Sequence, residues 1–198
     1  MINLHNRKSE IGFTLIELLI VAAIIGILLA IAIPNLLKAR ISANEANARK
    51  ALQTLKDAEY EYFEQDLDNN GVRNFTNFIG VLGTAGTLRD PAGTNDPLDT
   101  LVDSTFEGAV TNDGSPASSA DCTKSKAGYC LSWSSDADTD ALSLQWDFGW
   151  EASMTSARVN GRKDFSVYAD KVIKCTVTTQ STGASGAFEG SRNDTSCD

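Results

Sequence analysis

The feature that most constrains this chain is an apolar run from Phe13 to Ile33, 21 residues long, with Glu17 as its one charged member. A helix of about 20 apolar residues is long enough to cross a bilayer. A glutamate inside such a helix costs about 2.5–3.5 kcal/mol on insertion scales, so it is normally retained for a function. We therefore expect a membrane helix whose carboxylate has a partner outside the run.

The residues before this run are polar and include Arg7 and Lys8. A secretory signal peptide has its apolar stretch before the cleavage site, whereas here the apolar stretch follows Gly12. The two basic residues predict that this end stays cytoplasmic and that the rest of the chain is exported. We expect residues 1–12 to be a leader.

The sequence Gly12-Phe13-Thr14-Leu15-Ile16-Glu17, followed by an apolar helix with Pro34 near its end, resembles the class III signal of type IV pilins and type II secretion pseudopilins. The resemblance covers residues 5–60 closely and the rest only in architecture. It implies that a prepilin peptidase cuts between Gly12 and Phe13 and N-methylates Phe13. Glu17 falls where the family has its characteristic glutamate.

Two interpretations of Glu17 follow, and both can hold at once. Cleavage creates a positive amine at Phe13, which the Glu17 of a neighbouring subunit could neutralise during packing. In a filament core of low dielectric such a pair is short-ranged and fixes the axial register. The local alternative is a helix capping box, because Thr14-x-x-Glu17 has the required spacing.

Gly26 and Pro34 bound the weakest part of the expected helix. Proline removes one backbone hydrogen bond and clashes with the preceding turn. The resemblance implies that this stretch extends or melts when subunits pack into a filament. A static kink is the alternative.

Beyond Pro34 the helix is expected to continue with an amphipathic pattern. Apolar residues recur at spacings of three, four or seven, typical of a helix with one buried face; they are Ile41, Ala48, Leu52, Leu55, Ala58 and Tyr62. Tyr60, Tyr62 and Phe63 are expected to anchor a globular head. We divide the chain into a membrane or filament-core helix (13–34), the amphipathic half of the same helix (35–64) and a head (65–198).

The head is predicted to hold an antiparallel sheet of three or four strands after a long loop region, roughly 65–128. The candidate strands are a short one near Phe75–Leu82, then Tyr129–Trp133, Ala141–Trp150 and Phe165–Val177. Ala141–Trp150 alternates apolar and polar residues with a period of two, and Asn160-Gly161 signals a turn before the last strand. The expected fold class is α+β, the pilin fold, with one long N-terminal helix packed on this sheet and its hydrophobic half protruding.

All four cysteines, Cys122, Cys130, Cys175 and Cys197, lie in the distal half, and an even number after an export signal suits disulfides. Of the three possible pairings we favour Cys122–Cys130 with Cys175–Cys197, because polar loops separate the members of each pair. Buried free thiols are the alternative. A bond from Cys197 to Cys175 would tie down the polar tail, which is similar to the carboxy-terminal disulfide loop of many type IV pilins.

Two acidic stretches are weak calcium candidates. Asp66, Asp68 and Asn70, with Gly71, reproduce the first half of an EF-hand loop, but Asn77 stands where a bidentate glutamate belongs. The second stretch is Asp136-x-Asp138-x-Asp140. A solvated turn is the simpler interpretation of each, so we expect no metal and no cofactor.

Composition narrows the function further. The chain has 26 acidic and 17 basic residues and a net charge of −9, which argues against nucleic-acid binding. The sole histidine, His5, lies in the leader, so the mature chain would lack Ser-His-Asp, Cys-His and His-based zinc chemistry. We do not expect an enzyme.

The sequence thus predicts a structural subunit of a type IV pilus, with further copies of itself as its main partners in a helical filament. The other expected partners are the prepilin peptidase, the inner-membrane assembly platform and, before assembly, the membrane itself. The precursor would lie in the inner membrane and the product on the cell surface. The alternative is a type II secretion pseudopilin that forms a periplasmic piston.

Overall fold

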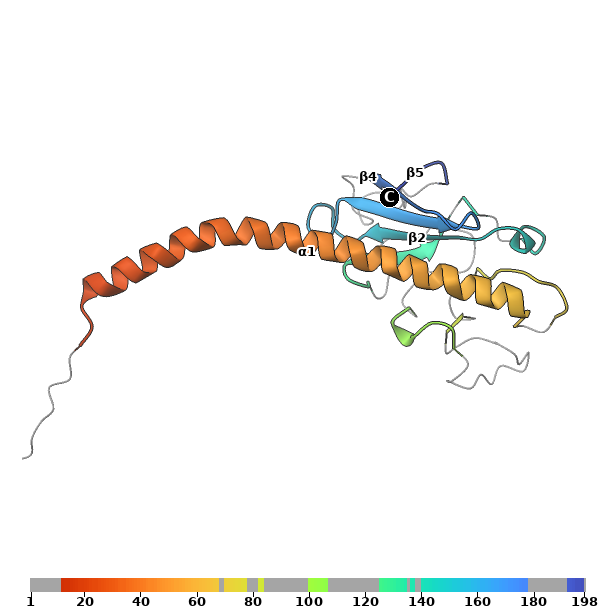
Figure 1. The fold of residues 1–198 in the computed structure, drawn as a ribbon, viewed down its shortest axis with the longest axis horizontal. Coiled ribbons are helices and arrows are strands. Elements are labelled where there is room, and N and C mark those ends of the chain that lie inside the picture. Colours follow the sequence, from red (N-terminus) through yellow and green to blue (C-terminus); the bar gives the residue numbers. More distant parts are fainter. Residues whose placement is uncertain are drawn as a thin grey trace, which may run out of the picture. The chain divides into compact units, whose positions relative to one another are not determined.

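The computed structural model describes residues 12–67, 70–77, 82–83, 100–106, 125–134, 136–137, 140–177 and 192–197. The chain divides into two compact units, one up to Ala39 and one from Arg40 onward. One helix, α1 (Leu15–Gln65), runs through both units, and every described strand belongs to the second (Figure 1). The predicted long helix is therefore confirmed, with ends within two residues of those expected.

In the first unit, α1 is apolar and exposed. It is long and apolar enough to cross a membrane, and none of its most apolar window is buried within the protein. Pro34 lies inside the helix, which is assigned as helical without a break from Leu15 through Gly26 and Pro34.

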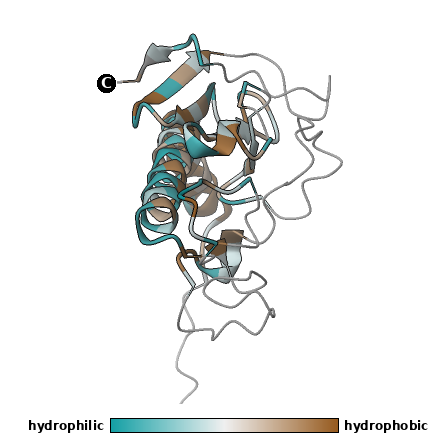
Figure 2. Cartoon of the chain, turned by 90° about the vertical axis from the view of Figure 1, so that its right-hand side faces the viewer, coloured by the Kyte–Doolittle hydropathy of each residue, from teal (hydrophilic) through white to brown (hydrophobic). Residues whose placement is uncertain are grey.

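In the second unit, α1 turns one face to the core. The six apolar residues predicted from helical periodicity are all buried, as are two more positions of the same helix, Ala51 and Glu59. Hydrophilic residues lie on the side of α1 away from the strands (Figure 2). Packing of this face supplies the stability that an isolated helix would lack.

The sheet is antiparallel throughout and its five strands follow one another in chain order. They are β1 (Tyr129–Trp133), β2 (Gly149–Met154), β3 (Lys163–Tyr168), β4 (Ile173–Val177) and β5 (Thr195–Ser196). The register places Trp133 opposite Trp150 and Phe165 opposite Cys175. The α+β fold with an antiparallel sheet is confirmed, and β1 has the predicted bounds.

The prediction of a strand over Ala141–Trp150 is wrong. Asp140 starts a turn there, because its carboxylate accepts hydrogen bonds from the backbone N–H groups of Leu142 and Ser143 at 3.0 and 3.1 Å. A short 3₁₀ helix, η3 (Ser143–Gln145), follows, and Trp146 is 75% exposed. The Asp140 carboxylate binds backbone N–H groups that a strand would pair with its neighbour. β2 therefore begins only at Gly149.

Two other strand predictions are corrected. Phe165–Val177 is two strands, β3 and β4, separated by a tight turn in which Lys171 N donates to Tyr168 O at 2.9 Å. Lys171 has a φ of 66°, which ends the strand conformation. Residues 75–77 of the predicted first strand are not in a strand, and 78–81 lie outside the described residues.

The turn predicted at Asn160-Gly161 is confirmed. Asn160 N donates to Ser156 O and Arg158 N donates to Gly161 O, at 2.9 and 2.8 Å. Gly161 is required there by close packing, because a Cβ atom at this position would lie 1.8 Å from the hydroxyl oxygen of Tyr129.

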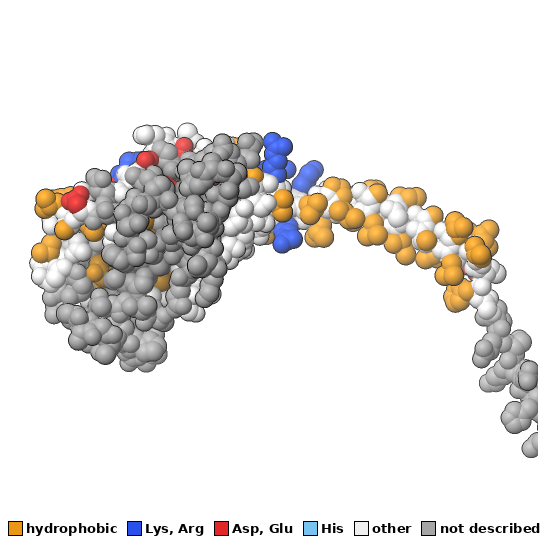
Figure 3. Space-filling view, turned by 180° about the vertical axis from the view of Figure 1, so that it is seen from behind, with side chains coloured by type: hydrophobic (Ala, Val, Ile, Leu, Met, Phe, Trp, Pro, Cys, Tyr) orange, Lys and Arg blue, Asp and Glu red, His pale blue; other side chains and the backbone are white. Residues whose placement is uncertain are grey.

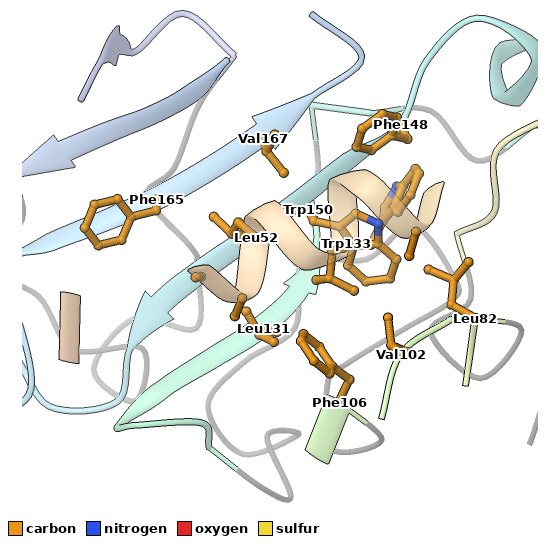
Figure 4. Close-up of a cluster of buried hydrophobic side chains, with 14 of the residues drawn as sticks. Leu52, Leu82, Val102, Phe106, Leu131, Trp133, Phe148, Trp150, Phe165 and Val167 are labelled. Carbon is orange, nitrogen blue, oxygen red and sulfur yellow. The ribbon is translucent and has the colours of Figure 1, made fainter. Parts of the chain in front are cut away.

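The core lies between α1 and the sheet (Figure 4). Leu52 and Leu55 of the helix are fully buried, as are Trp150 and Val167 of the sheet. At the end of the helix, Phe63 stacks on Phe75 with ring centroids 4.6 Å apart, and Tyr60 meets the edge of the same ring. The predicted aromatic anchor of the head is confirmed: Tyr62 is buried, and Tyr60 and Phe63 pack against the core.

Candidate assembly segment

We call residues Phe13–Pro34 the assembly segment. Its large apolar side chains are exposed, from Phe13 at 85% to Ile25 and Leu29 at 50%. In Figure 3 hydrophobic side chains cover the turns of this part of the helix on the face that is seen. Soluble monomers rarely expose apolar patches of more than a few hundred Å², so this surface is made to meet lipid or other protein.

Thr14 and Glu17 cap the start of the helix. The backbone N–H and the hydroxyl of Thr14 donate to Glu17 Oε2 at 2.9 and 2.7 Å, and Glu17 N donates to Thr14 Oγ1 at 3.3 Å. This is the reciprocal pattern of a capping box, so the local interpretation of Glu17 is confirmed. Both bonds to the carboxylate use Oε2, and the predicted pairing of Glu17 with the amine of a neighbouring subunit stays a prediction.

The interior of the segment contains a glycine without a packing role in the isolated chain. A Cβ atom at Gly26 would have no atom within 4 Å outside its own helix backbone. Packing within the chain therefore does not require glycine there. Its predicted role together with Pro34, extension or melting during assembly, stays a prediction.

The cysteine predictions are confirmed for one pair. Cys175 in β4 and Cys197 after β5 form a disulfide, with their Cα atoms 5.5 Å apart. Cys130 in β1 is fully buried and is not a free thiol. Its predicted partner, Cys122, lies outside the described residues, so that pairing stays a prediction.

The tail that ends in Cys197 has further attachments to the sheet. The guanidinium of Arg192 forms a salt bridge with Asp147 and lies 4.6 Å from the centre of the Tyr168 ring. The ammonium of Lys174 donates to the Arg192 carbonyl at 2.5 Å. These contacts and the disulfide hold the described end of the tail against β3 and β4.

The oxygens of the calcium candidates are used locally where they are described. Asp66 Oδ2 accepts from Gly71 N at 3.0 Å and Asn70 Oδ1 accepts from Val72 N at 2.7 Å. In the second stretch Asp140 caps the η3 turn and Asp136 accepts from Arg192 N at 2.8 Å. Asp68 and Asp138 lie outside the described residues, and within those residues no group of three or more potential ligands gathers.

Sequence reasoning missed a buried carboxyl group, Glu59. It is fully buried, and its Oε1 accepts from the indole N–H of Trp150 at 2.8 Å while Oε2 accepts from Thr76 N at 3.0 Å. Burial raises the pKa of Glu59 to about 8, against the opposing effect of these two donors. Its position between Ala58 and Tyr62, on the buried face of the helical pattern, was the signal that could have identified it.

A second buried carboxyl group lies in the sheet. Glu151 in β2 is 1% exposed and accepts a hydrogen bond from the hydroxyl of Ser134, which also contacts the Tyr168 hydroxyl at 2.9 Å. Burial is the main cause that raises the pKa of Glu151 to about 8. No comparable pattern marked Glu151 as buried, because glutamate in a strand is ordinarily solvent-facing.

Comparison with known proteins agrees with the predicted resemblance. Residues 7–33 match the family described as the prokaryotic N-terminal methylation motif. The type IV major pilin protein PilA of Myxococcus xanthus is 45% identical over 75 residues, which are 38% of this chain and 33% of that protein. The type IV wide pilus major component PilA4 of Thermus thermophilus is 43% identical over 85 residues, which are 43% of this chain and 60% of that protein.

The match to these relatives thus spans a third and three fifths of their lengths. No solved structure matches the chain significantly. The resemblance to type IV pilins at the amino terminus is confirmed, and both relatives are named as major components of pili.

Proposed function

We propose that this chain is a structural subunit of a type IV pilus, a non-enzymatic polymer of many copies. The observation that carries the proposal is the assembly segment, an exposed apolar helix whose one charged residue is held at its start. A subunit with this segment is stable in two environments, a bilayer and the interior of a helical bundle of copies. Similarity to two major pilins supports the second environment as the final one.

The proposed sequence of events begins with the precursor in the inner membrane, anchored by residues 13–34. The prepilin peptidase cuts between Gly12 and Phe13 and methylates the new amine. An assembly platform then draws the subunit out of the membrane into a helical filament on the cell surface. The head, whose core and disulfide are built without the assembly segment, is expected on the outside.

Glu17 has a double role in this proposal. Within its own chain it caps the helix through Oε2, and in the filament its carboxylate neutralises the Phe13 amine of a neighbouring subunit. A charge that is buried without a partner is energetically unfavourable at low dielectric. The axial register that pairs the Glu17 carboxylate with the Phe13 amine is therefore preferred over registers that leave both charges unpaired. Gly26 and Pro34 are proposed to let the helix extend locally during this packing.

The pseudopilin alternative predicts a different cellular outcome, so one comparison tests the two. Cells that lack the chain are compared with wild type for sheared surface filaments and for secretion of exported proteins. Loss of filaments with normal secretion supports the pilus subunit. Normal filaments together with a secretion defect contradict it and favour the periplasmic piston.

A further inference from the structure

The face of α1 that points away from the sheet carries an ordered pattern of charge. We define the outer stripe as seven residues of the second unit that share this face at helical spacing, and all seven are exposed: Ala43, Ala46, Lys50, Gln53, Asp57, Glu61 and Glu64. Positions 43, 50, 57 and 64 are seven residues apart, so they lie along one line of the helix surface.

Along the stripe one cation, Lys50, precedes an acidic group formed by Asp57, Glu61 and Glu64. Arg49, also exposed, stands beside Lys50, and Lys50 borders a hollow of about 400 Å³ that Lys126 also lines. Asp57, Glu61 and Glu64 border a second hollow of about 430 Å³, which Lys56 and Lys171 also line. Among the described residues the one salt bridge to this acidic group joins Asp57 to its neighbour Lys56, at 3.4 Å, and none reaches Glu61 or Glu64.

This order of charges bears on how two parallel copies can pack along the stripe. With no axial shift, the acidic groups of both copies face each other, which is unfavourable. A shift of 11 residues, about 16 Å at 1.5 Å per residue, places Lys50 of one copy opposite Glu61 of the next. Ala43 and Ala46 then continue the contact, because small residues let two helices approach closely.

We infer that the outer stripe is an interface between copies of this chain, in which Lys50 of one subunit contacts the Asp57–Glu61–Glu64 group of a parallel neighbour. The inference rests on the proposed filament and goes further, since it names a second contact, outside the apolar segment, that sets the axial shift. One exposed ion pair contributes at most about 1 kcal/mol. Repeated at every subunit, it selects the shifted arrangement over the unshifted one.

Charge exchange in the full chain tests the inference in cells. Lys50→Glu and Glu61→Lys are each expected to lower sheared surface filaments at least fivefold at unchanged precursor levels, and the combined variant is expected to return them to within twofold of wild type. Arg73→Glu is the matched control, an exposed charge reversal away from α1, and should assemble normally. Arg49 is left intact because its guanidinium lies 5.9 Å from the centre of the Phe165 ring.

Cross-linking supplies a readout that does not depend on filament yield. Filaments that carry Lys50→Cys and Glu61→Cys together should give covalent ladders after oxidation, whereas Lys50→Cys with Arg73→Cys should not. Normal filaments from both single charge reversals, or no ladder from the first pair in intact filaments, would overturn the interface and leave the pilus subunit standing. Absence of wild-type chain from surface filaments would overturn both.

Discussion

At the scale of single residues, the Thr14–Glu17 pair explains how an acid is tolerated at the start of an apolar helix. Thr14 donates twice to one carboxylate oxygen and accepts from Glu17 N, so the carboxylate has two donors within its own chain. In the proposed filament the same carboxylate also neutralises the amine of a second subunit. The proposal thus gives one side chain two roles, and substitutions of Thr14 and Glu17 can separate capping from assembly.

Thr14→Ala and Glu17→Ala should therefore behave differently. Thr14→Ala removes the hydroxyl that caps the helix, a loss of about 0.5–2 kcal/mol of helix stability, but it keeps the carboxylate, so filaments should still form. Glu17→Ala should be cleaved normally and fail to assemble. Immunoblots of membrane and sheared fractions measure both steps. Assembly of Glu17→Ala at wild-type level would contradict the intersubunit role.

Glu59 is a fully buried carboxyl group whose protonation affects the stability of the fold. Its folded-state pKa, about 8, lies above the ordinary value of 4.5. Between these two pH values the folded chain holds a proton that the unfolded chain has released. The stabilising effect is therefore complete below about pH 4.5 and is lost as pH rises through 8, at about 1 kcal/mol per pH unit. Glu151 contributes in the same direction.

Glu59→Gln should flatten this dependence. The amide cannot titrate, but it places an NH₂ group against a backbone or indole N–H, so at pH 5 the variant should be less stable by about 1–3 kcal/mol. The deficit should shrink as pH approaches 8. Urea unfolding of the detergent-solubilised chain at several pH values measures this trend. A difference between wild type and variant that is independent of pH would show that Glu59 keeps its charge in the fold.

At the scale of elements, α1 carries two different patterns in one continuous helix. Up to Ala39 its apolar residues lie all around the axis, and from Ile41 they occupy one face. An all-round apolar surface needs lipid or several helices as neighbours, whereas a one-sided surface needs a single sheet. The change of pattern marks where the environment of the helix changes.

Two tryptophans four residues apart, one before β2 and one within it, offer a matched pair. Trp150 in β2 is fully buried and bonded to Glu59, while Trp146, after η3, is 75% exposed. Trp150→Ala should cost about 3–5 kcal/mol of unfolding free energy, and Trp146→Ala should stay within about 0.5 kcal/mol. Denaturant midpoints of the two variants measure the contrast. Equal losses would mean that residues 141–150 form the strand that the alternation predicted.

Helix α1 and residues 141–150 show what the sequence could and could not predict. The helix and its buried face followed from the 3.6-residue period, because burial on one side is the only arrangement that satisfies it. The alternation Leu142, Leu144, Trp146 satisfies a strand equally well, but Asp140 captures the backbone N–H groups that a strand would pair. Such competition depends on local hydrogen bonds, which periodicity does not record. Glu151 was missed because its burial depends on tertiary packing.

The carboxy-terminal strand depends on its disulfide more than on its length. β5 has two residues, and its pairing with β4 is held by the Cys175–Cys197 bond across a separation of 22 residues. Replacing both cysteines with serine should lower the stability of the second unit by about 2–4 kcal/mol. It should also make the tail sensitive to protease. Limited proteolysis with mass spectrometry locates the cuts, and an unchanged cleavage pattern would show that Arg192 and Lys174 hold the tail by themselves.

At the scale of the whole molecule, the chain combines two units with opposite solvent requirements. The first unit exposes an apolar helix that lipid or other protein would cover, and the second buries its own apolar residues. A net charge of −9 favours solubility and repulsion between copies of the chain. The proposed filament would cover the apolar helix of the first unit and leave the second unit in contact with solvent.

The proposal that this chain is a processed pilus subunit is tested most directly by the mass of the amino-terminal peptide from purified surface filaments. We expect the filaments to consist mainly of this chain, with an amino terminus at Phe13 that carries one N-methyl group. Filaments that lack this chain, or a chain in them that still carries residues 1–12, would contradict it.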